Sequence, residues 1–269
     1  CMVAEKSADS SPPEVVCSGL AKRFGETEAV SPLDLRFGAG QTTALVGPSG
    51  CGKSTLLRMI AGLEDPSAGG VRIGGATPAE VRAKAELSIA FQDPSLLPWR
   101  TVRGNIALAQ KLARQKQDRT AVDQLIRLVG LEGFDDTRPG ALSGGMRQRA
   151  AIARCLVTQP KLLLLDEPFG AVDELTRQQL AEDLPLIWEA RGTTTLLVTH
   201  SVTEAVMLSD RVLVFSPRPA KVSTDIPVNL PRPRKAAMVH STEFASTAEA
   251  VTEALAAGRA QGPLGLAAQ

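Results

Sequence analysis

A glycine-rich turn near the start of the chain has the composition of a phosphate-binding loop. Residues 47–55 read GPSGCGKST and fit the pattern G-x-x-x-x-G-K-[ST] between a predicted strand, 41–46, and a predicted helix, 56–63. In such a loop, backbone N–H groups and the start of the helix attract phosphate oxygens, while the lysine reaches the outer phosphates and the serine binds Mg²⁺. The alternative is a glycine-rich turn without a ligand. The residues expected to bind a nucleotide are Gly47, Pro48, Ser49, Gly50, Cys51, Gly52, Lys53, Ser54 and Thr55.

A pair of carboxylates follows a second apolar segment. Four leucines at 162–165 are followed directly by Asp166 and Glu167. A buried parallel strand has this pattern, and ligands bind at the carboxyl ends of such strands. We expect Asp166 to hold Mg²⁺ through water and Glu167 to act as the general base on the attacking water. The alternative is a capped strand end before a turn at Pro168.

A second anion-binding turn lies at residues 142–149, which read LSGGMRQR. Ser143 is a good helix N-cap, and the glycines at 144 and 145 allow a phosphate to approach the backbone of a new helix. The chain thus has two helix starts that can bind phosphate, but one lysine-bearing loop and one carboxylate pair. Two chains paired head to tail, each lending this turn to the nucleotide of the other, would use both.

The elements around these motifs predict an α/β fold. Strands alternate with helices from about residue 41 onwards, which favours a mainly parallel sheet covered on both faces. The N-terminal strands at 15–20 and 29–37 look antiparallel, and the mainly helical stretch 93–141 looks like an insertion. Residues 217–235 are rich in proline and hold five basic residues, which we expect to form a solvated connector before one more helix at 241–257.

Length and composition narrow the class of protein. A chain of 269 residues with 43% hydrophobic and 22% charged residues suits one large domain or a domain with an inserted lobe. The net charge of +1 gives no general attraction to nucleic acid. No apolar run approaches the roughly 20 residues that span a bilayer, and the N-terminus lacks the apolar segment of a signal peptide. The scattered cysteines favour reduced thiols over disulfides or a zinc site. If the protein serves a membrane, we expect it to act through a partner.

Residues 142–149 resemble the signature motif of ABC ATPases, and the other landmarks of that family occur along the chain in the expected order. Phe24 resembles the aromatic that stacks on adenine, often a tyrosine, and Gln92 resembles the glutamine that contacts Mg²⁺ and senses the γ-phosphate. Asp173, in the sequence GAVD, resembles the loop that meets the partner subunit, and His200 resembles the switch histidine that contacts the γ-phosphate. Each of these four residues also has a simpler explanation. Phe24 could be a core aromatic and Gln92 a polar residue at a strand end. Asp173 could be a helix cap and His200 a structural histidine.

The resemblance covers about residues 14–235 and implies a P-loop NTPase fold: a RecA-like core with a mainly parallel sheet, N-terminal antiparallel strands and an inserted helical subdomain at about 93–141. A flexible tail at 1–13 and a partly helical extension at 236–269 complete the expected domains. The implied ligands are ATP and Mg²⁺. The resemblance implies that Glu167, His200 and Lys53 are catalytic, and that Phe24, Gln92 and the 47–55 loop bind ATP. It implies that Ser54, Gln92 and Asp166 bind Mg²⁺ and that Asp173 contacts the second subunit. The residues implied to act on the partner's ATP are Leu142, Ser143, Gly144, Gly145 and Met146.

Two stretches resemble importers of the nitrate, sulfonate and taurine group. They are FQDPSLLPW at 91–99 with TVRGNI at 101–106, and the segment 198–219. This resemblance implies an ATPase at the cytoplasmic face of the membrane that pairs with itself or a similar ATPase. It also implies a permease that docks near residues 96–105, from Leu96 to Asn105, an extracytoplasmic solute-binding protein that acts indirectly, and no nucleic acid partner. An ABC transporter for another cargo and a soluble, non-transport ABC ATPase remain as alternatives.

Overall fold

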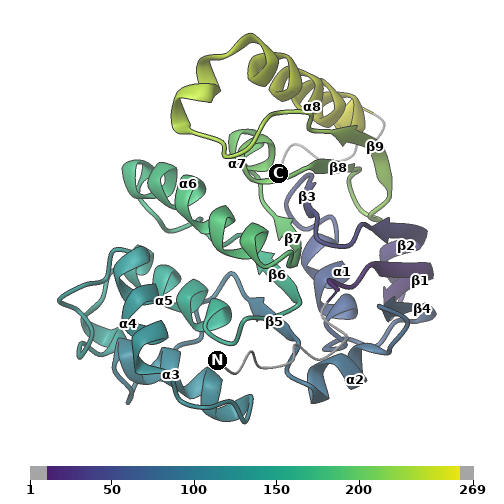
Figure 1. The fold of residues 1–269 in the computed structure, drawn as a ribbon. Helices are drawn as coiled ribbons and strands as arrows, with labels where there is room; N and C mark the ends of the chain where they lie inside the picture. The colour runs from purple at the N-terminus through teal and green to yellow at the C-terminus, as the bar shows by residue number, and fades with distance from the viewer. Residues whose placement is uncertain (1–10, 261–269) are drawn as a thin grey trace, which may run out of the picture.

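A six-stranded sheet forms the centre of the protein in the computed structural model, which describes residues 11–260. The order across the sheet is β5 (Leu87–Ala90), β6 (Leu162–Asp166), β7 (Thr194–Val198), β3 (Thr42–Val46), β8 (Arg211–Phe215) and β9 (Val222–Pro227) (Figure 1). The first five strands are parallel to one another, and β9 is antiparallel to β8. The predicted mainly parallel sheet is therefore confirmed. Residues 1–10 of the expected N-terminal tail and 261–269 of the expected C-terminal extension lie outside the described residues.

The leucine run of β6 shows why these strands are continuously apolar. Successive side chains of a strand point to opposite faces of the sheet. Leu163 and Leu165 pack into the core shared with helices α5 (Gly144–Leu156), α6 (Glu174–Ala190) and α7 (Val202–Leu208). Leu162 and Leu164 pack into the core shared with helix α1 (Lys53–Ile60). Both faces of the sheet are covered, so neither set of side chains can be polar.

A second, antiparallel sheet and helix α1 (Lys53–Ile60) cover one of these faces. The sheet has the order β2 (Thr27–Phe37), β1 (Val15–Phe24) and β4 (Ala68–Ile73). The two N-terminal strands were predicted, whereas β4 and the short helix α2 (Pro78–Ala83) were not. Strand β4 begins with AGG, and its two glycines weaken the sequence pattern of a strand because glycine disfavours extended structure.

Helices cover the opposite face and build a lobe at one side of the sheet. The lobe contains α3 (Val102–Leu112), α4 (Arg119–Leu128) and α5 (Gly144–Leu156), while α6 (Glu174–Ala190) and α7 (Val202–Leu208) lie against the sheet (Figure 1). Side-chain caps start two of the lobe helices: Thr101 Oγ accepts from the N–H of Gly104, and Asp118 accepts from the N–H of Ala121, each at 3.0 Å.

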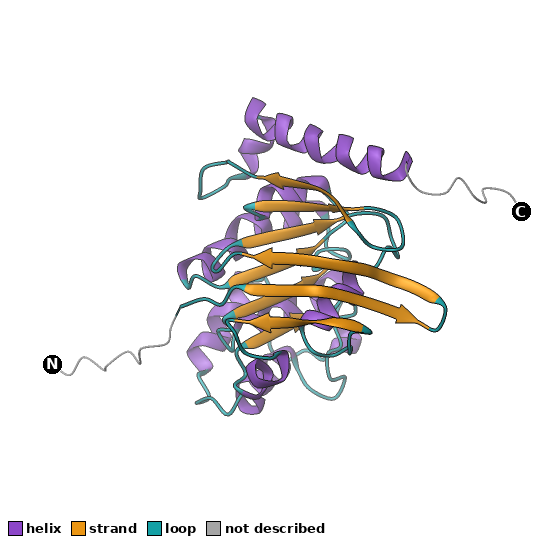
Figure 2. Cartoon of the chain, turned by 90° about the vertical axis from the view of Figure 1, so that its right-hand side faces the viewer, coloured by secondary structure: helices purple, strands orange, loops and turns teal. Residues whose placement is uncertain are grey.

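The C-terminal segment is built into the fold. After β9 come a short 3-10 helix, η2 (Ala236–His240), and α8 (Thr242–Ala260), which lies along the edge of the sheet next to β8 and β9 (Figure 2). Phe244 and Val251 anchor this helix in the core. Strand β9 lies within the proline-rich segment 217–235 and forms an edge of the sheet, which was not predicted.

Two arginines in that segment correct the expectation that its basic residues are solvated. Arg234 is 5% exposed, and its guanidinium donates to five backbone carbonyls, those of Val206, Met207, Ser209, Val228 and Leu230. Arg232 pairs with Asp210 and Glu189. The expectation was wrong for these two residues. Irregular chain and the end of α7 leave buried carbonyls without other partners, and the Nη1 and Nη2 groups of Arg234 donate to them.

Candidate functional site

The glycine-rich loop joins the carboxyl end of β3 to the start of α1. Gly52 has φ +124°, and a Cβ atom added to it would lie 2.5 Å from the carbonyl oxygen of Ala29. Only glycine fits this position. The close approach to β2 lets the chain turn sharply into α1, whose first residue is Lys53. The N-terminal N–H groups of a helix bind anions well.

The residues that follow the turn meet the end of β6. Lys53 is 5% exposed, and its ammonium donates to the carbonyls of Gly47 and Pro48 at 2.8 and 2.9 Å. The hydroxyl of Ser54 donates to Asp166 Oδ1 at 2.9 Å. Burial raises the pKa of Asp166, the charge of Glu167 acts in the same direction, and the bond from Ser54 opposes them. An oxygen-rich position beside a buried carboxylate suits a hard cation such as Mg²⁺.

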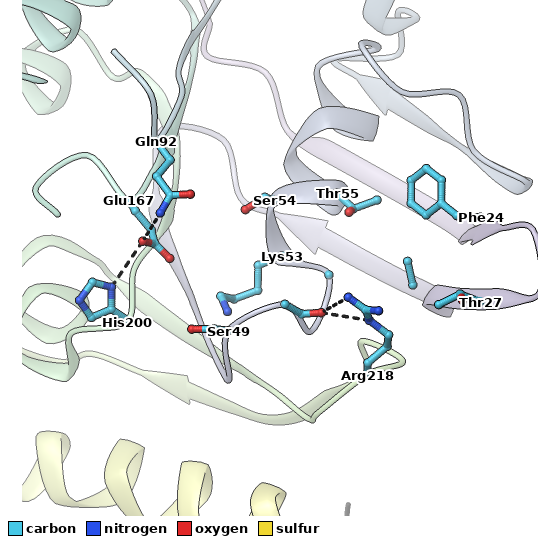
Figure 3. A pocket seen from close by; sticks show the side chains of 13 residues that line it. Phe24, Thr27, Ser49, Lys53, Ser54, Thr55, Gln92, Glu167, His200 and Arg218 are labelled. Carbon is cyan, nitrogen blue, oxygen red and sulfur yellow. Dashed lines mark hydrogen bonds and ion pairs between the residues drawn. The ribbon is translucent and has the colours of Figure 1, made fainter. Parts of the chain in front are cut away.

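Glu167 is the centre of a cluster of three polar side chains from three strand ends. Gln92 Nε2 donates to Glu167 Oε2 at 3.1 Å, and His200 Nδ1 lies 3.6 Å from the same oxygen (Figure 3). Gln92 follows β5, Glu167 follows β6 and His200 follows β7, three neighbours in the sheet. Because the carboxyl ends of parallel strands share one edge, residues distant in sequence converge here.

The backbone of Glu167 is strained. Its φ is +49°, a left-handed conformation that a residue with a long side chain rarely adopts. The N–H of Glu167 donates to the carbonyl of Val198 at 2.9 Å, which holds the residue just beyond the strand. Such strain costs about 1–3 kcal/mol and is concentrated at functional sites.

A cavity of about 750 Å³ connects these groups, with Phe24 on the opposite side of the phosphate loop from His200 (Figure 3). Phe24 is 49% exposed, so it is not a core aromatic, and the ammonium of Lys22 lies 4.9 Å from the centre of its ring. The lining brings together residues that the sequence singled out: Phe24, Ser49, Gly50, Gly52, Lys53, Ser54, Thr55, Gln92, Glu167 and His200.

Arg218 also lines the cavity, although the sequence suggested a solvated basic segment. Its Nε and Nη2 atoms donate to the carbonyl of Gly50 at 3.1 and 2.8 Å. These two bonds stabilise the conformation of the phosphate loop. The two residues are 168 positions apart, so no local pattern could have paired them. Thr27 is a second lining residue that the sequence did not single out.

Other predicted loop residues lie behind the cavity. Gly47, Pro48 and Cys51 are not in its lining, and the side chain of Cys51 is 1% exposed. Lys53 Nζ lies 3.6 Å from Cys51 Sγ on the buried side of the loop. The thiol is therefore a packing group, and any contact of Cys51 with phosphate would come from its backbone.

The signature turn lies apart from this cavity. Across the described residues 11–260, the cavity lining includes neither Asp173 nor any of Leu142, Ser143, Gly144, Gly145 and Met146. Ser143 caps α5 by accepting from the N–H of Met146 at 3.2 Å. A Cβ atom on Gly145 would lie 2.8 Å from the carbonyl of Ala171, so the turn packs tightly on the loop that carries Asp173. Asp173 caps α6 through the N–H of Thr176 at 3.0 Å.

The segment expected to dock a permease has a fixed shape and an exposed tip. The side chain of Asn105 is fully buried, accepts from the N–H of Leu97 at 2.7 Å and donates to the carbonyls of Leu97, Arg100 and Thr101. These bonds hold the loop while Trp99, at its tip, is 68% exposed. Packing of the lobe therefore does not account for Trp99.

Two features are absent from residues 11–260, the part of the chain that the structure describes. No group of three or more His, Cys, Asp or Glu side chains is arranged to hold a metal ion. No helix in this range has the length and apolar character needed to cross a bilayer.

Comparison with known proteins agrees with this geometry. The family model described as "ABC transporter" matches residues 30–170. The aliphatic sulfonates import ATP-binding protein SsuB 2 of Pseudomonas aeruginosa is 47% identical over 80% of this chain and 76% of its own length. The corresponding protein of Escherichia coli strain K12 is 44% identical over 86% and 87%, respectively. A dimeric ATP-binding cassette, MJ0796, bound to ADP and Pi in a post-hydrolysis state, superposes with a TM-score of 0.72 at 27% identity over 80% of this chain and 99% of that one. The chain therefore belongs to the ABC transporter family, as an ATP-binding and ATP-hydrolysing subunit.

Proposed function

We propose that this chain energises an importer of aliphatic sulfonates by hydrolysing ATP at the interface of two copies. One observation carries the hydrolytic part: Glu167 is held beside Gln92 and His200 in the cavity that contains Lys53 and the phosphate loop. The cargo rests on the relatives, which are named as sulfonate import subunits and share 42–47% identity with most of this chain. Nitrate and taurine are the competing cargoes within the same group.

The roles within one chain follow from the positions of the side chains. The N–H groups of the loop and the ammonium of Lys53 bind the phosphates, and Phe24 stacks on the adenine. Glu167 accepts a proton from the attacking water, and His200 contacts the γ-phosphate. Lys53 must exchange its two carbonyl partners for phosphate oxygens, which are stronger acceptors because they are charged.

The oxygen atoms of Ser54, Asp166 and Gln92 fit Mg²⁺. Asp166 is 3% exposed and carries a raised pKa, so its charge lacks full compensation from the protein alone. A divalent cation at this position would supply the missing positive charge. Bound Mg²⁺ would neutralise part of the charge that develops on the phosphate oxygens. Ser54 and Gln92 would orient the cation, while Asp166 would hold it through water.

The second half of each site comes from a second copy. The signature turn of residues 142–146 is a capped helix start that lies outside the lining of the cavity of its own chain, which supports a role on the nucleotide of the partner. The similarity to a solved cassette described as dimeric supports the same arrangement. Asp173 lies in the loop packed against this turn, which makes it a subunit contact.

The remaining partners follow from the transport function. A membrane permease docks at residues 96–105, and the exposure of Trp99 supports this assignment. The chain then acts at the cytoplasmic face of the membrane. A solute-binding protein on the other side acts through the permease. Residues 14–235 form the ATPase domain, with the helical subdomain at about 93–141 and an extension from 236.

Transport in proteoliposomes tests this function. The chain would be reconstituted with a candidate permease and a candidate solute-binding protein from the same organism, and phosphate release would be measured with ethanesulfonate, taurine or nitrate. We expect ethanesulfonate to stimulate ATP hydrolysis and to be taken up. Stimulation by nitrate alone would overturn the cargo, and ATP hydrolysis without coupling to any solute would overturn the transport role.

A further inference from the structure

A buried carboxylate next to the active site has no part in the mechanism above. Glu204 lies in the first turn of α7, four residues after His200, and is 8% exposed. Its Oε2 atom accepts from the hydroxyl of Thr199 at 2.5 Å. The same hydroxyl accepts from the N–H of Ser201 at 3.0 Å, and Ser201 Oγ accepts from the N–H of Glu204 at 3.2 Å.

These bonds form an extended version of a capping box. In an ordinary capping box, the carboxylate at the third helical position accepts directly from the N–H of the N-cap residue. Here the hydroxyl of Thr199 stands between Glu204 and Ser201, so the ring of bonds includes the residues on both sides of His200. The His200 side chain is 64% exposed and lies 3.6 Å from Glu167. Its place over the cavity is therefore set mainly by its backbone.

The second carboxylate oxygen of Glu204 faces Arg177 on α6, which in turn contacts the loop that precedes this helix. Arg177 Nε lies 3.6 Å from Glu204 Oε1, and Arg177 Nη2 donates to the carbonyl of Val172 at 2.8 Å. Arg177 Nη1 also pairs with Glu174 at 3.2 Å. Val172 directly precedes Asp173 and, with Ala171, packs against Gly145 of the signature turn. One carboxylate thus connects both flanks of His200 to the loop at 170–173.

Burial of this carboxylate costs free energy that the contacts only partly return. Burial raises the pKa of Glu204, while the bond from Thr199 and the charges of Arg177 and His200 act in the opposite direction. Glu174 adds a small effect in the same direction as burial. A neutral residue would avoid this cost, but it could not form the ion pair with Arg177.

We propose that Glu204 is a positioning residue for His200, and that Arg177 extends its hold to the loop at 170–173. A shift of that loop, when it meets a second copy, is then transmitted through Arg177 and Glu204 to the backbone of His200. This inference rests on the proposed role of His200 and adds a route inside one chain by which subunit contact aligns the histidine.

Steady-state ATP hydrolysis of the full chain tests the proposal. We expect Thr199→Val and Glu204→Gln to lower kcat about 10- to 100-fold, because a small misplacement of a reacting group has effects of this size, while KM for ATP stays within about twofold. Thr199→Ser keeps the hydroxyl and should restore kcat. If Glu204→Gln does not fold, the Thr199→Val and Thr199→Ser pair decides the question alone.

A matched control separates positioning from general destabilisation. Glu182 on α6 is also a partly buried carboxylate, which accepts from the N–H of Ala236 at 2.5 Å and pairs with Lys235, away from His200. Glu182→Gln should lower the unfolding temperature and leave kcat unchanged. An equal loss of kcat in Glu182→Gln and Glu204→Gln would overturn the proposal.

A spectroscopic measurement reports on His200 itself. The chain has two histidines, so ring-labelled histidine gives two signals, which His240→Asn assigns. We expect Thr199→Val and Glu204→Gln to shift or broaden the His200 signal, whereas Glu182→Gln should leave it in place. Unchanged kcat and an unchanged His200 signal in both variants would refute the positioning role. Full activity of His200→Ala would instead refute the proposed role of the histidine, which keeps the two failures distinguishable.

Discussion

Gln92 donates a hydrogen bond of 3.1 Å from its side-chain amide to the carboxylate of Glu167. The amide nitrogen of Gln92 thereby orients the proposed general base, while its oxygen is left to face the proposed cation. One side chain can serve both groups at once, because an amide carries a donor and an acceptor on the same plane. The base and the cation site are therefore linked through a single residue.

The first prediction concerns this base. Glu167→Gln keeps the shape of the side chain but cannot accept a proton, so we expect kcat for ATP hydrolysis to fall at least about 100-fold, while the Kd for ATP stays similar. Phosphate release and binding of a fluorescent ATP analogue measure the two quantities. Glu249→Gln, at an exposed position of α8, serves as control. Hydrolysis near the wild-type rate would show that Glu167 is not the base.

The second prediction concerns assembly. We expect the isolated chain to be mainly monomeric without nucleotide, and Glu167→Gln to form a dimer with ATP and Mg²⁺, because the triphosphate bridges two incomplete half-sites. Light scattering after size exclusion measures the mass. Adding Ser143→Arg to Glu167→Gln should abolish the dimer and preserve ATP binding, since Ser143 lies outside the cavity of its own chain. A monomer at high protein concentration with saturating ATP would contradict the shared site.

The third prediction concerns the pH dependence of stability. Burial raises the pKa of Asp166, so the folded chain binds this proton more tightly than the unfolded chain, and stability falls as pH rises through the raised pKa. Asp166→Asn removes the buried charge. Without Mg²⁺ and nucleotide, it should therefore increase the free energy of unfolding at pH 7, and the gain should disappear towards about pH 3, below the ordinary pKa of Asp, where the carboxyl is protonated in both states.

Urea unfolding at the two pH values measures this difference. Asp173 gives a control of opposite sign, because hydrogen bonds from the backbone and side chain of Thr176 lower its pKa. Its stabilising effect should be lost as pH falls. An equal gain from Asp166→Asn at both pH values would mean that packing, and not charge, is the cause.

The fourth prediction concerns the C-terminal segment. Arg234→Met removes a buried cation that donates to five carbonyls, and buried acceptors without partners cost about 1–3 kcal/mol each. We expect the free energy of unfolding to fall by at least about 3 kcal/mol. Lys235→Met is the control, since that side chain is 58% exposed. Similar unfolding curves for both variants would show that water replaces the guanidinium without loss.

The fifth prediction concerns the exposed tryptophan. Trp99→Ala should leave the unfolding temperature and basal ATP hydrolysis unchanged, because the side chain is 68% exposed, and should weaken copurification with the permease together with transport. Large aromatic residues carry much of the free energy at protein interfaces. Leu112→Ala tests another exposed apolar residue, 73% exposed on the same lobe. Unimpaired permease binding by Trp99→Ala would place the dock elsewhere.

The sequence predicted the elements that carry strong local patterns. The run of leucines before Asp166 marked a buried strand, and the 47–55 loop marked the turn into a helix. Strand β9 was missed because Pro227 and its half-exposed, alternating residues are typical of an edge position. Helix α2 was missed although its capping box, Thr77 with Glu80, is visible in the sequence. Six residues are too few for a helical period to be recognised.

Contacts between distant segments could not be predicted in the same way. Gln92 and His200 were identified by resemblance and Glu167 by its place after the leucine run, but their meeting depends on the neighbouring positions of β5, β6 and β7. Arg218 and Arg234 look alike in a basic, proline-rich stretch. Arg218 donates to a carbonyl of the phosphate loop, whereas Arg234 donates to carbonyls at the end of α7. The path of the chain after β8 decides which carbonyls each arginine meets.

The separation of the signature turn from the cavity of its own chain has a genetic consequence. A chain with Glu167→Gln still presents an intact turn, and a chain with Ser143→Arg still presents an intact loop and base. A mixed pair of these two chains contains one complete site and one doubly defective site. Two alleles that are each inactive alone are thus expected to complement one another when expressed together, whereas two alleles altered on the same side of the site are not.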